Sequence, residues 1–332
     1  MTTVLVTGAK LVPAEALDLI ESRGYTVRHL AENKLTDGEL DKALHDVAGY
    51  LIGGEEELTA EHLSDHAATL RAIAFVGTDF RAFVPGWQRA FDLGIPLINC
   101  PGANATSVAE YTALLLLMMA RPIADQPLTA DGSVPPAPAQ GMELAGRTLG
   151  IVGLGRIGSR VASIAAGFGM NVVYSGRHEV PGSPLRYVDQ SELFRTSDVV
   201  SLHRPGLAHG EPAIVGAHEL GLMRPGGILI NAGHYDLVDP VALAEAISGK
   251  GVRAAFDGIG AGREWRELLR YPHDRFLALP QMGYLTSDAN RRAGLMAATA
   301  VCDVLDGGTS PLVNNPGHQA SAARSASSTR GT

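Results

Sequence analysis

The sequence predicts an α/β protein with two doubly wound parallel sheets, and three observations lead to that fold class. Short apolar runs alternate with segments of helical periodicity twice along the chain, over residues 4–102 and again over 148–280. A glycine-rich turn follows the first strand of the second series. The 332 residues are enough for about two domains, each with its own core.

The first series begins with a short apolar strand at 4–6. A helix is expected over 13–23, because apolar side chains recur there at helical spacing until Gly24. Further strands, with helical segments between them, are expected at 27–30, 49–52, 70–76 and 96–100. Such alternation is typical of a parallel sheet covered by helices.

A long apolar helix is expected over 106–120. It is hydrophobic nearly all round, so it should be buried against other protein, and a homodimer through this helix is expected. Five prolines in the next segment, 122–138, favour an irregular connection. The second series follows from Thr148, and a last helix is expected over 290–305. Residues 316–332 have the composition of a disordered tail.

Composition and charge argue against several classes of function. The net charge is −8, with 27 Lys and Arg against 35 Asp and Glu, so a nucleic-acid partner is not expected. Cys100 and Cys302 are too few for a disulfide framework or a cysteine-rich zinc site. The longest apolar stretch, 108–120, is too short to span a bilayer. We expect a cytoplasmic protein that acts on a small molecule, without a membrane or metal.

The glycine-rich turn 153–158 (GLGRIG) directly follows the apolar strand 148–152 and opens a helix. Gly153 permits a tight turn, Gly155 lets the backbone approach a pyrophosphate, and Gly158 lets the helix pack closely on the strand. The helix N-terminus offers N–H groups to that anion. A Rossmann-like dinucleotide site is therefore predicted, with a purely structural turn as the alternative. The expected cofactor contacts here are Gly153, Gly155, Arg156, Ile157 and Gly158.

The end of the next strand should contact the adenosine ribose of that cofactor. NAD-preferring proteins place an acidic side chain there, about 20 residues beyond the turn. This chain has Gly176 instead, between Ser175 and Arg177. A 2′-phosphate is then not repelled, and the Arg177 guanidinium can pair with it. These three residues predict NADP(H) in preference to NAD(H), unless Arg177 only solvates the strand end.

Several further blocks accompany the glycine turn. They are 99–104 (NCPGAN), 107–110 (SVAE), 143–150 (ELAGRTLG), 198–203 (DVVSLH) with Pro205, 223–231 (MRPGGILIN) and 237–239 (LVD). Together they resemble the blocks of the D-2-hydroxyacid dehydrogenases over nearly all of the chain except the tail. The resemblance implies an NAD(P)-dependent oxidoreductase. We expect a discontinuous substrate domain, 1–102 plus 286–315, an inserted cofactor-binding domain, 103–285, and a cofactor in the cleft between them.

Three positions depart from the pattern of that family. Its members usually bind the substrate's carboxylate and carbonyl with an Arg three residues after the last Asn of the MRPGGILIN block, where this chain has His234. The supporting Glu would fall at Gly262, and Gln281 takes the place of the catalytic His. Because a bidentate carboxylate ligand is missing and Gln281 cannot take a proton at neutral pH, a plain 2-hydroxy acid is not the expected substrate.

His234 is then the histidine that the fold should direct at the nicotinamide. Its segment 231–236 (NAGHYD) is similar to one in S-adenosylhomocysteine hydrolases, which use a tightly held NAD to oxidise an alcohol transiently. We expect hydride transfer to or from a carbonyl, an imine or a polarised alkene, with His234 as proton donor or orienting group. The alternatives are a non-catalytic nucleotide-binding member that acts through a protein partner, or a 2-hydroxyacid dehydrogenase with rearranged catalytic residues.

Other residues are candidates for the same site. The expected catalytic set is His234, Gln281 and Tyr284, with Glu264 as a candidate helper. The loop of Gly77, Thr78 and Asp79 lies where the family has its substrate loop. The remaining expected cofactor contacts are His203, Pro205, Ala232 and Asp257.

Four more residues are expected to be structural. His62 and His66 have the spacing of a metal pair, but no further ligand lies nearby, so a solvated helix face is expected. Trp87 and Trp265 are expected to pack.

Overall fold

A computed structural model describes residues 2–81, 83–121, 140–207 and 210–315. The chain divides into two compact units, unit 1 (1–104 with 285–332) and unit 2 (105–284). The expected boundaries fall within two residues of these junctions. The proline-rich connection and the expected tail lie outside the described residues.

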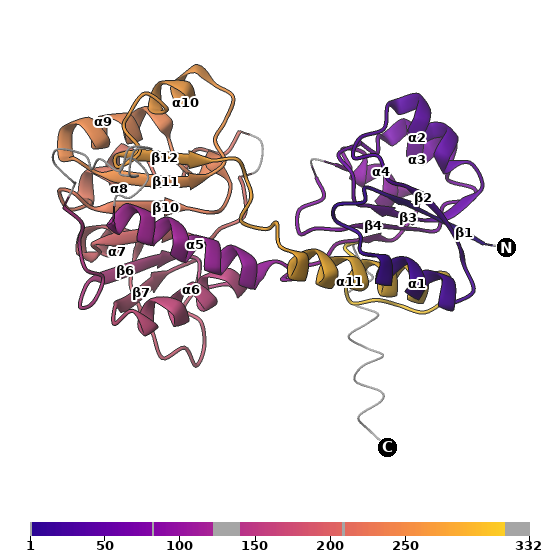
Figure 1. Cartoon of the computed structure of the whole chain (residues 1–332), viewed down its shortest axis with the longest axis horizontal. Helices are drawn as coiled ribbons and strands as arrows, with labels where there is room; N and C mark the ends of the chain where they lie inside the picture. Colours follow the sequence, from indigo (N-terminus) through magenta and orange to yellow (C-terminus); the bar gives the residue numbers. More distant parts are fainter. Residues whose placement is uncertain (1, 82, 122–139, 208–209, 316–332) are drawn as a thin grey trace, which may run out of the picture. The chain divides into compact units, whose positions relative to one another are not determined.

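Unit 1 contains a five-stranded parallel sheet in the order β2-β1-β3-β4-β5 (Figure 1). Its strands are β1 Thr3–Thr7, β2 Thr26–Leu30, β3 Val47–Ile52, β4 Ala72–Phe75 and β5 Leu97–Ile98. Every residue of β3 and β4 is buried, as expected for strands with helices on both faces. All five strands overlap the predicted ones, and β4 and β5 are shorter.

Five helices cover this sheet. They are α1 Ala14–Ser22, α2 Asp37–Leu44, α3 Ala60–Asp65, α4 Trp87–Asp92 and α11 Ser287–Leu305. The last helix returns to lie along α1 (Figure 1), and both contribute to one hydrophobic core. It starts three residues before the predicted 290 because Thr286 caps it, its hydroxyl accepting the N–H of Ala289 (3.2 Å).

Unit 2 contains a seven-stranded parallel sheet in the order β12-β11-β10-β9-β6-β7-β8. Its strands are β6 Thr148–Val152, β7 Asn171–Ser175, β8 Arg186–Tyr187, β9 Val199–Leu202, β10 Ile228–Asn231, β11 Arg253–Asp257 and β12 Phe276–Leu279. Strand order reverses between β6 and β9, where open α/β sheets bind ligands beyond the carboxyl ends of their strands. The site should therefore lie at that edge.

The helical segments of unit 2 are α5 Ala105–Ala120, α6 Arg156–Gly167, α7 Gln190–Thr196, α8 Ala217–Leu222, α9 Pro240–Lys250, α10 Arg263–Leu268 and the 3₁₀ turn η1 Tyr235–Leu237. No helix among the described residues is long and apolar enough to cross a membrane.

Helix α5 is only partly buried within unit 2. Leu115, Leu116 and Met119 pack into the core, whereas Leu114 and Leu117 are 46% and 39% exposed. Two apolar side chains of this helix are therefore exposed among the described residues.

Candidate functional site

The glycine turn lies at the switch point of the unit 2 sheet, where β6 ends beside β9. Gly153 N donates to Ser175 O (2.9 Å), and His203 N donates to Val152 O (2.9 Å). Gly153 has a φ of 100°, and a Cβ there would lie 2.6 Å from the His203 carbonyl oxygen. Only glycine satisfies both the backbone angle and this close approach.

The other two glycines of the turn differ in their surroundings. A Cβ on Gly158 would lie 2.3 Å from the Gly153 carbonyl oxygen, so glycine is needed for α6 to approach β6. A Cβ on Gly155 would meet no protein atom within 4 Å. Gly155 is the N-cap of α6, and Arg156 and Ile157 form its first turn. This open space at a helix N-terminus fits the pyrophosphate of a dinucleotide.

A pocket opens beside this turn, at the end of β7. It has about 350 Å³ of open space, and its lining includes Ser175, Gly176, Arg177 and Arg204. Ser175 is 3% exposed, and its hydroxyl has no hydrogen-bond partner among the described residues. An unsatisfied buried hydroxyl fits a ligand that supplies the missing partner, such as a cofactor's ribose or phosphate.

His203 has a structural place next to the turn. Its Nε2 lies 2.8 Å from Ser201 Oγ, and burial lowers the pKa of the ring to about 4. The ring is therefore neutral near pH 7 and is not a proton source there. Its backbone carbonyl is what approaches the glycine turn, and Pro205 is exposed in the loop that follows.

His234 lies beyond β10 in a turn fixed by Asn231. The Asn231 side chain accepts the N–H of Gly233 (3.0 Å) and donates to the His234 carbonyl (3.0 Å). Ala232, between these residues, is half-buried. The His234 ring stacks on Tyr235 with centroids 4.3 Å apart, which holds the ring at the sheet edge.

Asp236 completes a pair with this histidine. Its Oδ1 lies 2.8 Å from His234 Nδ1, and its Oδ2 accepts the N–H of Leu207 (2.9 Å). The His234 side chain is 42% exposed, and its Nε2 has no hydrogen-bond partner in the part of the chain that the structure describes. Nδ1 accepts the backbone N–H of Asp236 (3.4 Å) and lies beside the Asp236 carboxylate, whose Oδ1 has no hydrogen-bond partner among the described residues. The other ring nitrogen, Nε2, is available.

Asp236 was not predicted as a site residue, although it belongs to the segment 231–236 that contains His234. The signal in the sequence is an acidic residue two positions after His234, in a turn that brings the two side chains together. Arg204, in the pocket at the end of β7, was also missed.

Asp257 orders the loop beyond β12. Its two carboxylate oxygens accept the N–H groups of Met282 (2.8 Å) and Gly283 (2.9 Å). Burial raises the pKa of Asp257, and these two hydrogen bonds oppose the shift. Burial and the Asp257 carboxylate together raise the pKa of Tyr111 to about 12. Asp257 therefore positions the loop that carries Gln281.

Gln281 lies in this loop with a φ of 43°, in the left-handed region that non-glycine residues rarely adopt. Its side chain lies over Gly258, where a Cβ would fall 2.3 Å from Gln281 Cγ. Tyr284 is 41% exposed at the end of unit 2, and Glu264 is exposed in the first turn of α10. Among the described residues, no hydrogen bond or ion pair joins His234 to Gln281 or Glu264.

The candidate substrate loop of unit 1 is held by its own contacts. Asp79 accepts the N–H of Arg81 (3.2 Å) and lies 3.5 Å from its guanidinium. Gly77 is crowded by Phe75, since a Cβ there would lie 2.4 Å from the ring. The backbone of Thr78 accepts a hydrogen bond from Asn99. Asp79 thus caps the turn.

The remaining candidates take structural places. The solvated face expected for His62 and His66 is wrong. His62 is 6% exposed, with Nδ1 against Thr59 in a helix cap, and the His66 side chain is 11% exposed, with Nε2 2.8 Å from Asp41. Trp265 is 6% exposed against Phe256, and Trp87 packs edge-on against Phe91.

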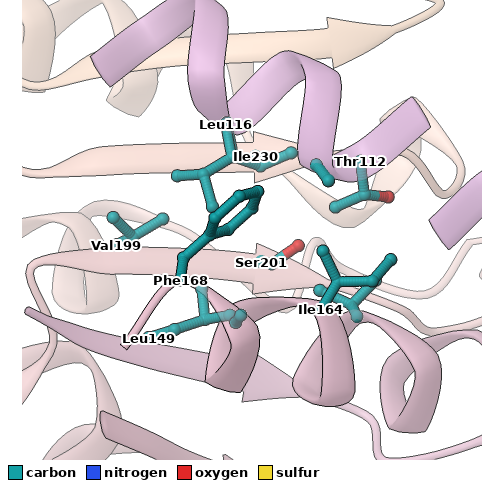
Figure 2. A pocket seen from close by; sticks show the side chains of 11 residues that line it. Thr112, Leu116, Leu149, Ile164, Phe168, Val199, Ser201 and Ile230 are labelled. Atoms are coloured by element: carbon teal, nitrogen blue, oxygen red, sulfur yellow. The ribbon is translucent and has the colours of Figure 1, made fainter. Parts of the chain in front are cut away.

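A second, apolar pocket lies beneath α5 (Figure 2). It is walled by side chains of α5, α6, β6, β9 and β10, including Leu116, Ile164 and Phe168. Its two hydroxyl groups are already used, since Thr112 donates to Val108 O and Ser201 contacts His203. A space without available polar groups is a packing gap in the core rather than a candidate site.

Residues 113–281 match the family described as "D-isomer specific 2-hydroxyacid dehydrogenase, NAD binding domain". The chain belongs to this family. The resemblance seen in the sequence blocks is confirmed, and so is an oxidoreductase whose NAD-binding domain lies within unit 2.

Relatives of the D-2-hydroxyacid dehydrogenase family cover most of the chain. Hydroxypyruvate reductase of Thermotoga maritima is 33% identical over 266 residues, 79% of this chain and 86% of that protein. D-3-phosphoglycerate dehydrogenase of Escherichia coli K12 is 31% identical over 318 residues, 92% of this chain and 76% of that protein. The structure of the TT0316 protein from Thermus thermophilus has a TM-score of 0.79 at 30% identity, covering 94% and 99% of the two chains. The predicted α/β fold class is confirmed.

Proposed function

We propose that this dehydrogenase transfers hydride to or from a carbonyl, imine or polarised alkene that is not a plain 2-hydroxy acid. The observation that carries the proposal is the His234–Asp236 pair, 2.8 Å apart, at the carboxyl edge of the unit 2 sheet. Imidazole is the side chain that exchanges protons most readily near neutral pH. The nearby carboxylate restricts how the ring can turn, so Nε2 faces a substrate in one orientation.

A bound nicotinamide supplies or accepts the hydride. In the reducing direction, His234 donates its Nε2 proton to the carbonyl oxygen or imine nitrogen as the hydride reaches carbon. The Asp236 carboxylate stays beside Nδ1, with Oδ1 2.8 Å away, while Nε2 loses and regains the proton. Gln281 orients the substrate through its amide, which donates and accepts hydrogen bonds but carries no proton to transfer.

A 2-hydroxyacid dehydrogenase with rearranged residues is the second candidate function. The relatives named hydroxypyruvate reductase and D-3-phosphoglycerate dehydrogenase favour it through 33% and 31% identity. A turnover screen with NADPH and NADH across carbonyls, imines, activated alkenes and hydroxypyruvate separates the two. Absence of turnover with all of them, together with tight nucleotide binding, would favour a non-catalytic member instead.

Simple 2-oxo acids are expected to be poor substrates. Because His234 replaces an arginine, a carboxylate loses a bidentate, charge-assisted contact worth about 1.5–3 kcal/mol. Pyruvate and glyoxylate should therefore show kcat/KM values about 10–100-fold below that of the best substrate in the screen. Efficient pyruvate reduction contradicts this substrate class.

We propose that NADPH binds more tightly than NADH. The end of β7 carries Ser175, Gly176 and Arg177, with no acidic side chain among these three residues to repel a 2′-phosphate. An Arg177→Ala change should weaken NADPH binding by about 1–3 kcal/mol and leave NADH binding nearly unchanged. Fluorescence titration of both cofactors measures this. Equal or reversed affinities for the unaltered protein would reject the preference.

A homodimer through α5 is expected. Leu114 and Leu117 expose apolar surface on a helix whose other face is in the core of unit 2. Sedimentation should show a dimer at micromolar concentration, and a Leu114→Lys/Leu117→Lys variant should shift it toward monomer. A monomeric unaltered protein contradicts the proposal. A cytoplasmic location is also proposed, in keeping with two buried cysteines that form no disulfide.

A further inference from the structure

We infer that Arg204 is a second specificity-determining residue, which holds the 2′-phosphate of NADP(H) together with Arg177 and the Ser175 hydroxyl. The inference rests on the proposed preference for NADP(H) and identifies the residues that set it. All three side chains line the pocket at the end of β7.

Sheet topology brings these residues together from distant parts of the chain. β6 lies between β7 and β9, and β6 pairs with β9 from Leu149 and Val199 onward. Ser175 ends β7, whereas Arg204 follows β9 by two residues. Since parallel strands end at one edge, both side chains reach the pocket from opposite sides of the glycine turn.

The stem of Arg204 is held against the glycine turn. A Cβ on Gly153 would lie 3.2 Å from Arg204 Cγ, and a Cβ on Gly233 would lie 3.2 Å from its carbonyl oxygen. The residue is half-buried, so its guanidinium is directed by packing rather than free in solvent. Arginine presents a planar, always-charged fork that suits phosphate.

The loop that carries Arg177 is also fixed. Tyr187 donates its hydroxyl to the Gly176 carbonyl (3.1 Å), and Val180 N donates to the Tyr174 hydroxyl (2.9 Å). These two tyrosines pack with ring centroids 5.4 Å apart. The backbone at Arg177 is therefore anchored on both sides, although its side chain is exposed.

Charge in the pocket favours a phosphate monoester. Neither Arg177 nor Arg204 has a carboxylate within ion-pair distance among the described residues. One acid, Asp189, also lines the pocket, and its Oδ1 is used to accept the N–H of Glu192 (2.8 Å) at the start of α7. Two guanidinium groups against one carboxylate leave a net positive site, and a phosphate monoester carries about −1.5 to −2 at pH 7.

The Ser175 hydroxyl supplies a directional contact that the charges lack. It is buried and has no partner among the described residues, so it can donate to a phosphate oxygen without breaking an existing hydrogen bond. Gln190, in contrast, already donates its side-chain N–H to the Ile214 carbonyl (2.8 Å). The pocket thus offers two guanidinium groups and one hydroxyl to a single anion.

The test uses 2′,5′-ADP and 5′-AMP, which differ only in the 2′-phosphate, titrated calorimetrically into the full-length protein. The unaltered protein should bind 2′,5′-ADP at least about 10-fold more tightly. Arg204→Gln should weaken binding of 2′,5′-ADP about 10–100-fold, the range for a lost charged hydrogen bond, and change binding of 5′-AMP by less than about twofold. Ser175→Ala should weaken 2′,5′-ADP selectively as well. Arg195→Gln, an exposed arginine of α7 outside the pocket, is the matched control and should change neither.

Three results would overturn the inference, and they separate it from the proposed cofactor preference. If Arg204→Gln weakens both nucleotides equally, Arg204 contacts adenine or ribose instead. If Arg177→Gln weakens binding of 2′,5′-ADP selectively and Arg204→Gln does not, the preference for NADP(H) stands and the role of Arg204 is rejected. If the unaltered protein binds 5′-AMP as tightly as 2′,5′-ADP, the preference and the inference both fail, and Asp189→Asn then tests whether that acid holds the ribose. Arg204→Lys, which keeps the charge, should retain part of the selectivity.

Discussion

Replacing His234 by alanine is expected to lower turnover about 10²–10⁴-fold, the usual contribution of a positioned general acid or base. Cofactor affinity should change little, because the glycine turn and the pocket at the end of β7 do not use this side chain. Steady-state kinetics on the best substrate, with a separate NADPH titration, measure the two effects independently.

Two further variants show whether His234 acts with Asp236. Asp236→Asn removes the charge 2.8 Å from Nδ1 but keeps a side chain of the same shape, so kcat should fall less than in His234→Ala and its pH profile should change. Gln281→Ala should also cost less, since an amide orients and does not protonate. Thermal melting shows whether the loss of the contact between the His234 ring and Tyr235 destabilises the fold. A His234→Ala protein with full activity would remove the histidine from the chemistry.

The sequence predicted the fold well because the signals for it are local. Apolar strands such as Val4–Val6 and the glycine turn 153–158 are contiguous, and their periodicity determines their structure without knowledge of distant residues. Helix α11 was predicted with a late start because its cap, Thr286, precedes the apolar periodicity. Its packing along α1 joins segments far apart in the chain, which periodicity alone does not reveal.

The candidate site was predicted less completely, because its pairs depend on side-chain direction. His234 was found by its position after a strand, but Asp236 reaches it only through the 3₁₀ turn at 235–237. Arg177 was found because it is near the glycine turn in sequence. Arg204 enters the same pocket from another strand end, and only sheet order places it there.

Replacing Gly155 by alanine is expected to abolish most cofactor binding while the protein stays folded. The new methyl group meets no protein atom within 4 Å, and the backbone at Gly155 is extended, so the fold accommodates it. The loss of a glycine N-cap should cost no more than about 1 kcal/mol of stability. The methyl group instead occupies the open space at the start of α6, where a pyrophosphate must approach the backbone. Affinity for NADPH and NADH should both fall about 10–100-fold, as when charged hydrogen bonds are lost.

Gly167→Ala is the matched control, since it makes the same chemical change at the other end of the same helix. A Cβ on Gly167 also meets nothing within 4 Å, and this residue is the last of α6. Alanine loses less conformational entropy in a helix, so this variant should gain up to about 1 kcal/mol of stability and bind cofactor normally. Thermal melting and cofactor titration of both variants give four measurements. If Gly155→Ala binds NADPH and NADH as tightly as Gly167→Ala does, the pyrophosphate does not lie at the start of α6, and the cofactor site must be sought elsewhere on unit 2.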